Sequence, residues 1–193
     1  IANYSGTAKT DWSWAGLFSD FDLDGSMEYF VSNGYRRNNG DNDFKIKMAT
    51  ARSAKGGFPA ERREEAYNWM PEIRSSNRLF TANEDLKYKD MAPAWGLAQP
   101  SFSNGAAYAD LDNDGDLDLV INNMEEKAGI YKNTSNNKNY NYIKLKLEGS
   151  IKNPFAIGAK VEIKTGDEIQ VQELHNARGY LSSVSHLLTF GCG

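Results

Sequence analysis

Two short acidic stretches carry the residues whose types and spacing could do chemistry. The first loop runs from Asp20 to Glu28, and the second loop runs from Asp110 to Asp118. Each loop has a carboxylate at positions 1, 3, 5 and 9 and a glycine at position 6. Calcium takes several oxygen ligands, and a short loop supplies them when oxygen-bearing residues alternate along a chain that curls around the ion. The spacing therefore predicts two calcium sites.

The predicted ligands follow from these positions. We expect Asp118 to make the second loop bind more tightly, because its side chain is shorter and less mobile than that of Glu28 and because Asp116 adds charge nearby. Magnesium is less expected, since its rigid octahedron retains several waters and disfavours an all-protein cage. The predicted set is Asp20, Asp22, Asp24, the Ser26 carbonyl and Glu28 in the first loop, and Asp110, Asp112, Asp114, Asp116 and Asp118 in the second.

The acidic loops have two other interpretations. An EF-hand starts in the same way but needs flanking helices and a bidentate glutamate at position 12. Position 12 is Val31 in one copy and Ile121 in the other, and the flanks are strand-like, so the EF-hand fails. The second alternative is that Asp-Gly merely marks a hairpin turn. Repetition of the whole pattern at matching positions favours a metal.

Charge and composition narrow the function classes. The net charge is −4, from 26 acidic and 22 basic residues, and nine of the acids lie in the two loops. Clustered carboxylates repel one another unless a cation lies among them. Cys192 is the single cysteine, which excludes an internal disulfide, and Cys/His zinc spacing is absent. The sequence has no basic stripe for nucleic acid and no apolar run long enough to span a membrane.

Apolar segments on both sides of each loop predict the elements that position the carboxylates. Trp12 to Phe18 and Tyr29 to Val31 flank the first loop, and Gly105 to Ala109 and Leu117 to Ile121 flank the second. Each set reads as strand, tight loop, strand, and the two sets form an internal repeat. Between them, a charged stretch with spaced apolar residues predicts a helical insertion over about residues 47–76.

The C-terminal part has a different pattern. Tyr142 to Leu147, Ala159 to Lys164 and Glu168 to Leu174 alternate apolar and polar residues, which predicts three strands of one small, half-exposed antiparallel sheet. The polar segment Asn133 to Asn139 is the predicted linker. We therefore expect one domain at residues 1–138 and a second at 139–193.

The loops resemble a known family. The strings "FSDFDLDGSMEYFVSNG" and "YADLDNDGDLDLVINN" are similar to the FG-GAP or VCBS repeats of integrin-type β-propellers. The string "NYIKLKLEGSIKNPFAIGAKVEIKTGDEIQVQEL", followed by "RGYLSSV" and "TFGCG", resembles the ASPIC/UnbV domain of the cartilage acidic protein family and its bacterial relatives. A closed propeller needs more blades than these. The resemblance thus implies an all-β fold of partial propeller blades, as in the C-terminal part of a longer bacterial chain.

The resemblance implies a secreted or cell-surface protein, associated with the outer membrane if bacterial, whose calcium is structural. We expect it to bind proteins or glycans and to catalyse no reaction. Further blades of the same chain or a larger complex are also expected partners. One alternative is a subunit of an outer-membrane surface assembly. Another is a calcium-assisted polysaccharide-processing enzyme, although the only histidines are His175 and His186 and no catalytic motif accompanies them. No role follows for Arg178-Gly179-Tyr180.

Overall fold

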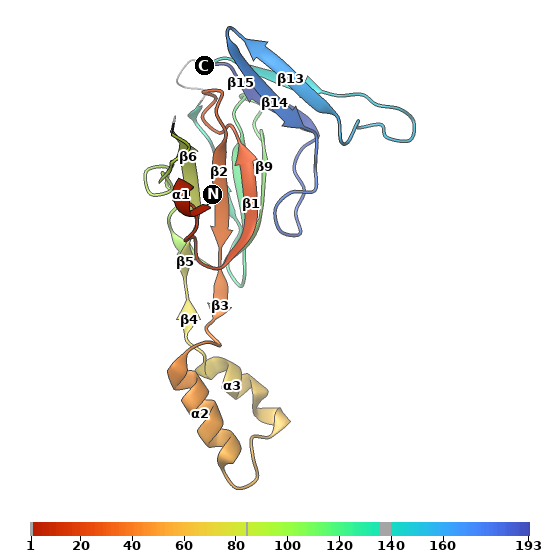
Figure 1. Ribbon diagram of the computed structural model, residues 1–193. Coiled ribbons are helices and arrows are strands. Elements are labelled where there is room, and N and C mark those ends of the chain that lie inside the picture. The colour runs from red at the N-terminus through yellow and green to blue at the C-terminus, as the bar shows by residue number, and fades with distance from the viewer. Residues whose placement is uncertain (1, 84, 136–139) are drawn as a thin grey trace.

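The structure, a computed structural model, describes residues 2–83, 85–135 and 140–193 (Figure 1). Its regular elements are mostly β-strands in several small antiparallel sheets, with few helices. The predicted all-β fold is therefore confirmed. Across these residues the sheets form no closed propeller. Among the helices described, none is long and apolar enough to cross a membrane.

Two larger sheets contain the repeat. Each predicted strand-loop-strand unit is an antiparallel hairpin, with β1 and β2 flanking the first loop and β9 and β10 flanking the second. The apolar strands pair, and the acidic residues lie in the connection between them, apart from Glu28 and Asp118, which begin the second strand of each hairpin. One sheet has the order β1 (Ser13–Ser19), β2 (Glu28–Asn33), β6 (Arg78–Ala82), β7 (Tyr88–Asp90), and the other has the order β11 (Gly129–Tyr131), β10 (Asp118–Asn123), β9 (Ser103–Ala109).

The main hydrophobic core joins these two sheets. Leu17 and Phe30 come from the first hairpin, Leu79 from β6, and Leu119 and Ile121 from β10, and all five are buried in one cluster. Burying a side chain of this kind contributes about 1.5–3 kcal/mol. The core therefore holds the two hairpins, and with them the two loops, in one rigid body.

A buried polar network lies where the two copies of the repeat end. The Asn77 side chain accepts a hydrogen bond from Asn33 N at 2.9 Å and donates one to Ser103 Oγ at 3.0 Å. Ser103 Oγ also bonds Asn123 Oδ1 at 2.8 Å. A Cβ on Gly34 would lie 2.3 Å from the Ser103 carbonyl oxygen, so only glycine allows this approach. The network fixes one hairpin against the other.

The helical insertion projects as an arm (Figure 1). Strands β3 (Tyr35–Arg37) and β4 (Glu72–Ile73) pair at its base and lead to α2 (Asn42–Ser53), the 3-10 turn η1 (Ala60–Arg62) and α3 (Arg63–Trp69). The helices begin before the expected position 47, because the Asp41 side chain accepts a bond from Phe44 N at 2.8 Å and caps α2. They end before Pro71, as a proline requires.

The expected single three-stranded C-terminal sheet is not what the structure contains. Strand β12 (Tyr142–Lys146) pairs with the last strand, β15 (Leu187–Gly191), while β13 (Lys160–Thr165) pairs with β14 (Glu168–Glu173). Alternation identifies strands but not their partners, and β15 has no alternation to reveal it. Leu174, Leu188 and Phe190 form the separate core of this domain. Part of the predicted linker and the boundary near residue 138 fall outside the described residues.

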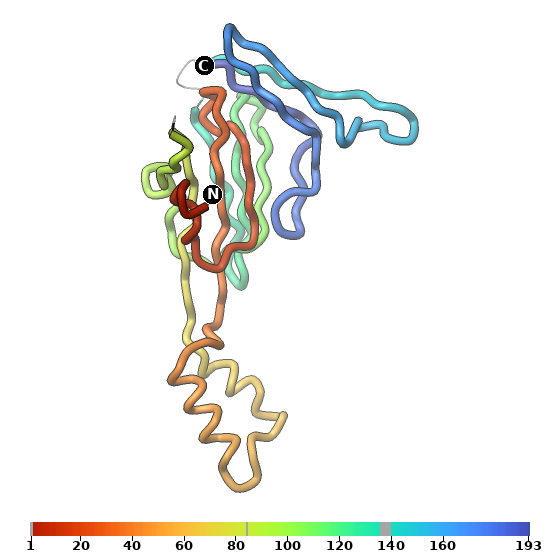
Figure 2. Tube along the Cα trace, in the orientation of Figure 1, coloured from red at the N-terminus to blue at the C-terminus, as the bar shows by residue number. Residues whose placement is uncertain are grey.

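The C-terminal residues return to the top of the repeat. In Figure 2 the end of the chain lies beside the connection between β1 and β2. The remaining short elements are α1 (Ala2–Ser5) and the pair β5 (Ser75–Ser76) and β8 (Pro100–Ser101).

Candidate metal centre

The first loop brings three carboxylates together. Asp20 follows β1 directly and Glu28 begins β2, so the antiparallel register places them side by side, with Ser19 opposite Glu28. Asp22 reaches the same point from within the loop, and one carboxylate oxygen from each of the three lies within 4.8 Å of the others. Asp20 is 1% exposed and Glu28 is 2% exposed. Positions 1, 3 and 9 thus converge in a site largely closed to solvent.

The hydrogen bonds of Asp20 leave one oxygen for a ligand. Its Oδ2 accepts bonds from Gly25 N at 2.9 Å and from Gly191 N at 3.1 Å. Its Oδ1 is buried with no hydrogen-bond partner in the described part of the chain. A buried carboxylate oxygen without a donor is costly. A cation held jointly with Asp22 and Glu28 would satisfy it, so the donor set fits a hard divalent ion.

Burial also shifts the protonation of this site. Loss of hydration raises the pKa of Glu28 to about 8, although Phe21 N donates to its Oε2 at 2.8 Å and favours the ionised form. The same cause raises the pKa of Asp20 to about 6, and the neighbouring aspartates add to both shifts. At neutral pH the Glu28 carboxyl is therefore mostly protonated unless a positive charge lies beside it. The first loop is therefore a site that a cation would stabilise.

The second loop repeats this geometry. Oxygens of Asp110, Asp112 and Asp118 also lie within 4.8 Å of one another. Gly115 N donates to Asp110 Oδ2 at 3.0 Å and Leu111 N donates to Asp118 Oδ2 at 2.9 Å, matching the bonds that Gly25 and Phe21 make in the first loop. The two loops are thus copies in three dimensions as well as in sequence.

Both loops turn through left-handed backbone at positions 4 and 6. The glycines at position 6, Gly25 and Gly115, have φ of 94° and 110°. Position 4 is Leu23 in the first loop, at φ 62°, and Asn113 in the second, at φ 61°. Asparagine adopts this conformation readily, whereas it is strained for leucine. The glycine at position 6 predicts its turn from the sequence alone, whereas nothing at position 4 of the first loop predicts the left-handed turn there.

The loops differ in their basic neighbours. Lys132 pairs with Asp112 and lies 3.6 Å from Asp114 Oδ2, and Lys144 pairs with Asp110. The hydrogen bond from Lys132 lowers the pKa of Asp112. Within the described residues, Asp20 and Glu28 make no comparable ion pair. Lysines beside the second loop compete with a cation, which opposes the sequence argument that this loop binds more tightly.

The carboxylates of the other predicted ligands do not join the converging groups. Asp24 is exposed and accepts a bond from Ser26 N at 2.7 Å, and Ser26 is exposed as well. Asp114 is half-buried and Asp116 is fully buried. The carboxylates of Asp24, Asp114 and Asp116 therefore lie outside the converging side-chain groups, while the Ser26 carbonyl stays a predicted ligand. The alternating spacing alone does not distinguish positions 5 and 7 from positions 1, 3 and 9, because the curl of the loop decides which oxygens meet.

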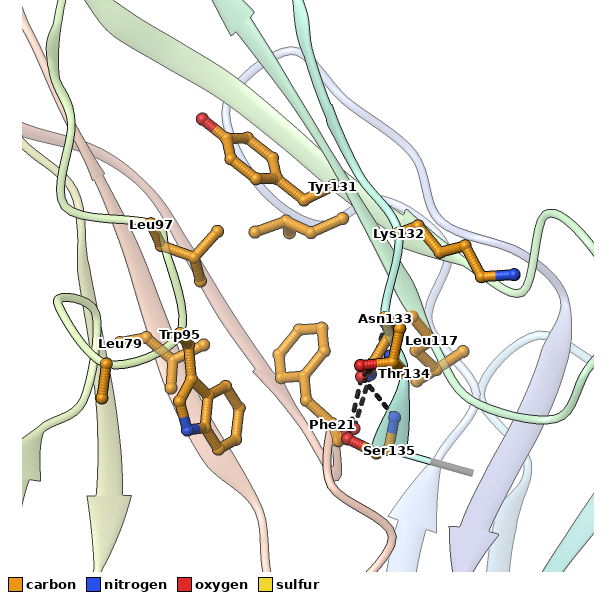
Figure 3. Close-up of a pocket in the computed structure, with 12 residues that line it drawn as sticks. Phe21, Leu79, Trp95, Leu97, Leu117, Tyr131, Lys132, Asn133, Thr134 and Ser135 are labelled. Carbon is orange, nitrogen blue, oxygen red and sulfur yellow. Dashed lines mark hydrogen bonds between the residues drawn. The ribbon is translucent and has the colours of Figure 1, made fainter. Parts of the chain in front are cut away.

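A cavity of about 360 Å³ opens between the two loops (Figure 3). Its apolar wall includes Phe21 from the first loop and Leu117 from the second, and Trp95 faces them. Asn133 spans the loops at the rim, since its Nδ2 donates to the Phe21 carbonyl at 2.6 Å and to the Leu117 carbonyl at 3.1 Å. The two acidic loops therefore form part of this pocket, which has apolar walls and a polar edge.

Several other residues singled out in the sequence have structural partners. His175 Nε2 lies 2.7 Å from Glu173 Oε1, and His186 stacks on Phe155. Arg178 donates to the Tyr108 hydroxyl at 3.1 Å and to two backbone carbonyls. These contacts tie the C-terminal domain to β9 and give the Arg178-Gly179-Tyr180 segment a place at the domain junction.

Comparison with known proteins agrees with part of the resemblance. The family described as ASPIC and UnbV matches residues 149–193, which span β13, β14 and β15. Among curated proteins, none matches the chain. The C-terminal resemblance is therefore supported, while the similarity of residues 1–138 to FG-GAP or VCBS repeats stays a prediction.

Proposed function

We propose that this protein is a calcium-stabilised extracellular or cell-surface module that binds protein or glycan partners and has no catalytic role. The observation that carries the proposal is the burial of Asp20 and Glu28 beside Asp22, with Asp20 Oδ1 left without a donor. Such a site is unfavourable when empty and favourable with a divalent cation. The same three positions converge in the second loop, which supports a second ion.

Calcium is the ion that suits these sites. Each offers carboxylate oxygens only, and calcium accepts flexible all-oxygen coordination whereas magnesium retains its waters. Loops of this kind can work with weak affinity because calcium outside cells is millimolar. In this proposal the metal holds the hairpins in shape within FG-GAP-like blades, and the partner binds elsewhere on the module.

The pocket between the loops is the surface we propose for the partner. Trp95 and Tyr131 line it with Lys132, and an aromatic platform beside polar groups suits a glycan or an extended peptide. Because Phe21 and Leu117 belong to the metal loops, loss of calcium would deform the pocket wall. Partner binding should then depend on calcium, although the partner does not contact the ion.

Thermal unfolding tests the calcium proposal. A free calcium concentration about ten times the Kd stabilises the fold by about 1.4 kcal/mol per site, which raises the Tm by roughly 3–6 °C. EGTA should lower the Tm by this amount for each occupied site, and calcium but not magnesium should restore it. A Tm that ignores both EGTA and calcium would refute the proposal.

The rival enzyme hypothesis needs a separate assay. Incubation with uronic-acid polymers in calcium, followed by measurement of chain length, distinguishes depolymerisation from binding. We expect unchanged polymers. Shortened polymers whose production is abolished by EGTA would favour the calcium-assisted enzyme instead.

A further inference from the structure

The C-terminal strand completes the first metal loop from another domain. Gly191 N donates to Asp20 Oδ2 at 3.1 Å, and Gly193 N donates to the Leu23 carbonyl at 3.1 Å. Asp20 and Gly191 are 171 positions apart in the sequence, and their bond is buried. The loop and the chain end therefore form one hydrogen-bonded unit.

The contact is too close to be incidental. A Cβ on Gly191 would lie 2.2 Å from Asp20 Oδ2 and 2.5 Å from Leu23 Cα, so any side chain there would push the strand away from the loop. Gln170 of β14 donates to the Gly191 carbonyl at 2.7 Å, and its Nε2 also lies beside the loop, 3.2 Å from where a Cβ on Gly25 would be. The backbone of Gly191 is thus fixed between the metal loop and the C-terminal domain.

The bond also orients the carboxylate. Two backbone donors, Gly25 N and Gly191 N, hold Asp20 Oδ2, so Oδ1 is the oxygen without a donor in a carboxylate that meets Asp22 and Glu28. Leu23 lies in the strained left-handed region, and its carbonyl is the one that Gly193 holds. The second loop has Asn113 at this position, a residue that adopts the conformation without such support.

From these contacts we infer that calcium binding at the first loop and docking of the C-terminal domain are thermodynamically linked, with Gly191 as the positioning residue. The inference rests on the proposed calcium site. Docking presets Asp20 and the backbone at Leu23 for the ion, so a docked domain raises calcium affinity. By reciprocity, calcium strengthens docking by the same factor. Calcium therefore acts as an interdomain lock as well as a loop stabiliser.

Nuclear magnetic resonance of the full chain measures both sides of the linkage. A calcium titration followed at the Gly25 amide reports occupancy of the first loop, and the Gly115 amide reports the second. Hydrogen exchange at the Gly191 and Gly193 amides reports docking. We expect saturating calcium to slow exchange at both amides by about fivefold or more, the lower end of typical coupling between sites.

Variants supply the reciprocal measurement. Gly191→Ala should weaken calcium binding at the Gly25 reporter by the same factor and leave the Gly115 reporter within about twofold. Gln170→Ala, which removes the hydrogen bond to the Gly191 carbonyl, should have a smaller effect in the same direction and serves if Gly191→Ala does not fold. Leu187→Ala, on the same strand but away from the loop, is the matched control and should match the wild type.

The outcomes separate this inference from the proposed function. If calcium shifts the Gly25 amide but exchange at Gly191 and Gly193 is unchanged, the lock is refuted and the calcium site stands. Equal calcium affinity in Gly191→Ala, Gln170→Ala and wild type refutes it too. If the wild type shows no calcium response at Gly25, the site and the lock both fall.

Discussion

Replacing Glu28 with glutamine should stabilise the metal-free protein and remove the calcium response of the first loop. Glu28 is buried at position 9 of that loop, where loss of hydration raises its pKa from 4.5 to about 8. Between these two values the folded metal-free protein retains a proton that the unfolded chain has released. The free energy of unfolding therefore falls as pH rises through this range.

The size of the effect follows from the shift. A pH of about 7.5 is some three units above the ordinary pKa of glutamate, and each unit corresponds to about 1.4 kcal/mol. The ionisable group thus costs the metal-free fold up to about 4 kcal/mol. Glutamine has nearly the same shape and no ionisation, so Glu28→Gln recovers most of this cost. For a chain of this size the Tm rises by roughly 8–16 °C.

Differential scanning calorimetry in EGTA and in calcium measures both parts of the prediction. Glu28→Gln should unfold at a higher temperature than wild type in EGTA, and its calcium-induced rise should be smaller by the contribution of one site. Asp118→Asn, at the same position of the second loop, is the matched comparison. Both Asp118 oxygens accept backbone bonds, from Leu111 N and Asn133 N, so this change should lower the metal-free Tm.

Two results would refute the reasoning. A lower Tm for Glu28→Gln in EGTA would mean that the buried carboxyl is not a source of instability. An undiminished calcium response in Glu28→Gln would mean that Glu28 is not a ligand.

Three further predictions concern the same region. In EGTA, the free energy of unfolding of the wild type should fall as pH rises from about 5 to 8, because the pKa values of Asp20 and Glu28 are raised in the folded protein. Without EGTA, calcium affinity should rise over the same pH range, because the ion competes with protons for these two carboxylates. Calorimetry that shows a flat calcium affinity across this range would contradict the prediction. Lys132→Met should strengthen calcium binding at the second loop by about two- to fivefold at low salt, with the gain vanishing at high salt, because an exposed ion pair is screened; isothermal titration at two salt concentrations decides this. Asn133→Ala should lower the free energy of unfolding by about 1–3 kcal/mol, since two loop carbonyls lose their donor. The control Asn122→Ala, at an exposed position, should change the free energy of unfolding measured by chemical denaturation little. Equal effects of the two variants would show that the hydrogen bonds from Asn133 to the two loops are unimportant.

Local chemistry could be predicted from the sequence. Apolar runs around acidic loops identified the two hairpins, and the glycine at position 6 identified the tight turn. Period-2 alternation identified β12, β13 and β14, because a half-exposed strand must alternate. Each of these features depends on residues within a few positions of one another, which is the range over which sequence patterns carry information.

One missed feature could have been predicted from the sequence, and another could not. Asp41 stands three residues before Phe44 in a typical capping arrangement, yet the helical insertion was expected to begin later. Strand β15 has no alternating pattern, because its residues from Leu188 to Gly191 are all buried between its neighbours. Its pairing with β12 therefore came only from the structure.

The sequence by itself determined that two nine-residue loops carry carboxylates spaced for calcium and that strands flank them. The tertiary structure decided which oxygens converge, that Asp20 and Glu28 are buried, and that Gly191 reaches the first loop while Lys144 reaches the second. The physical reason is that ligand spacing is a local property of the chain. Burial, charge compensation and interdomain hydrogen bonds depend on segments far apart in sequence, which only packing brings together.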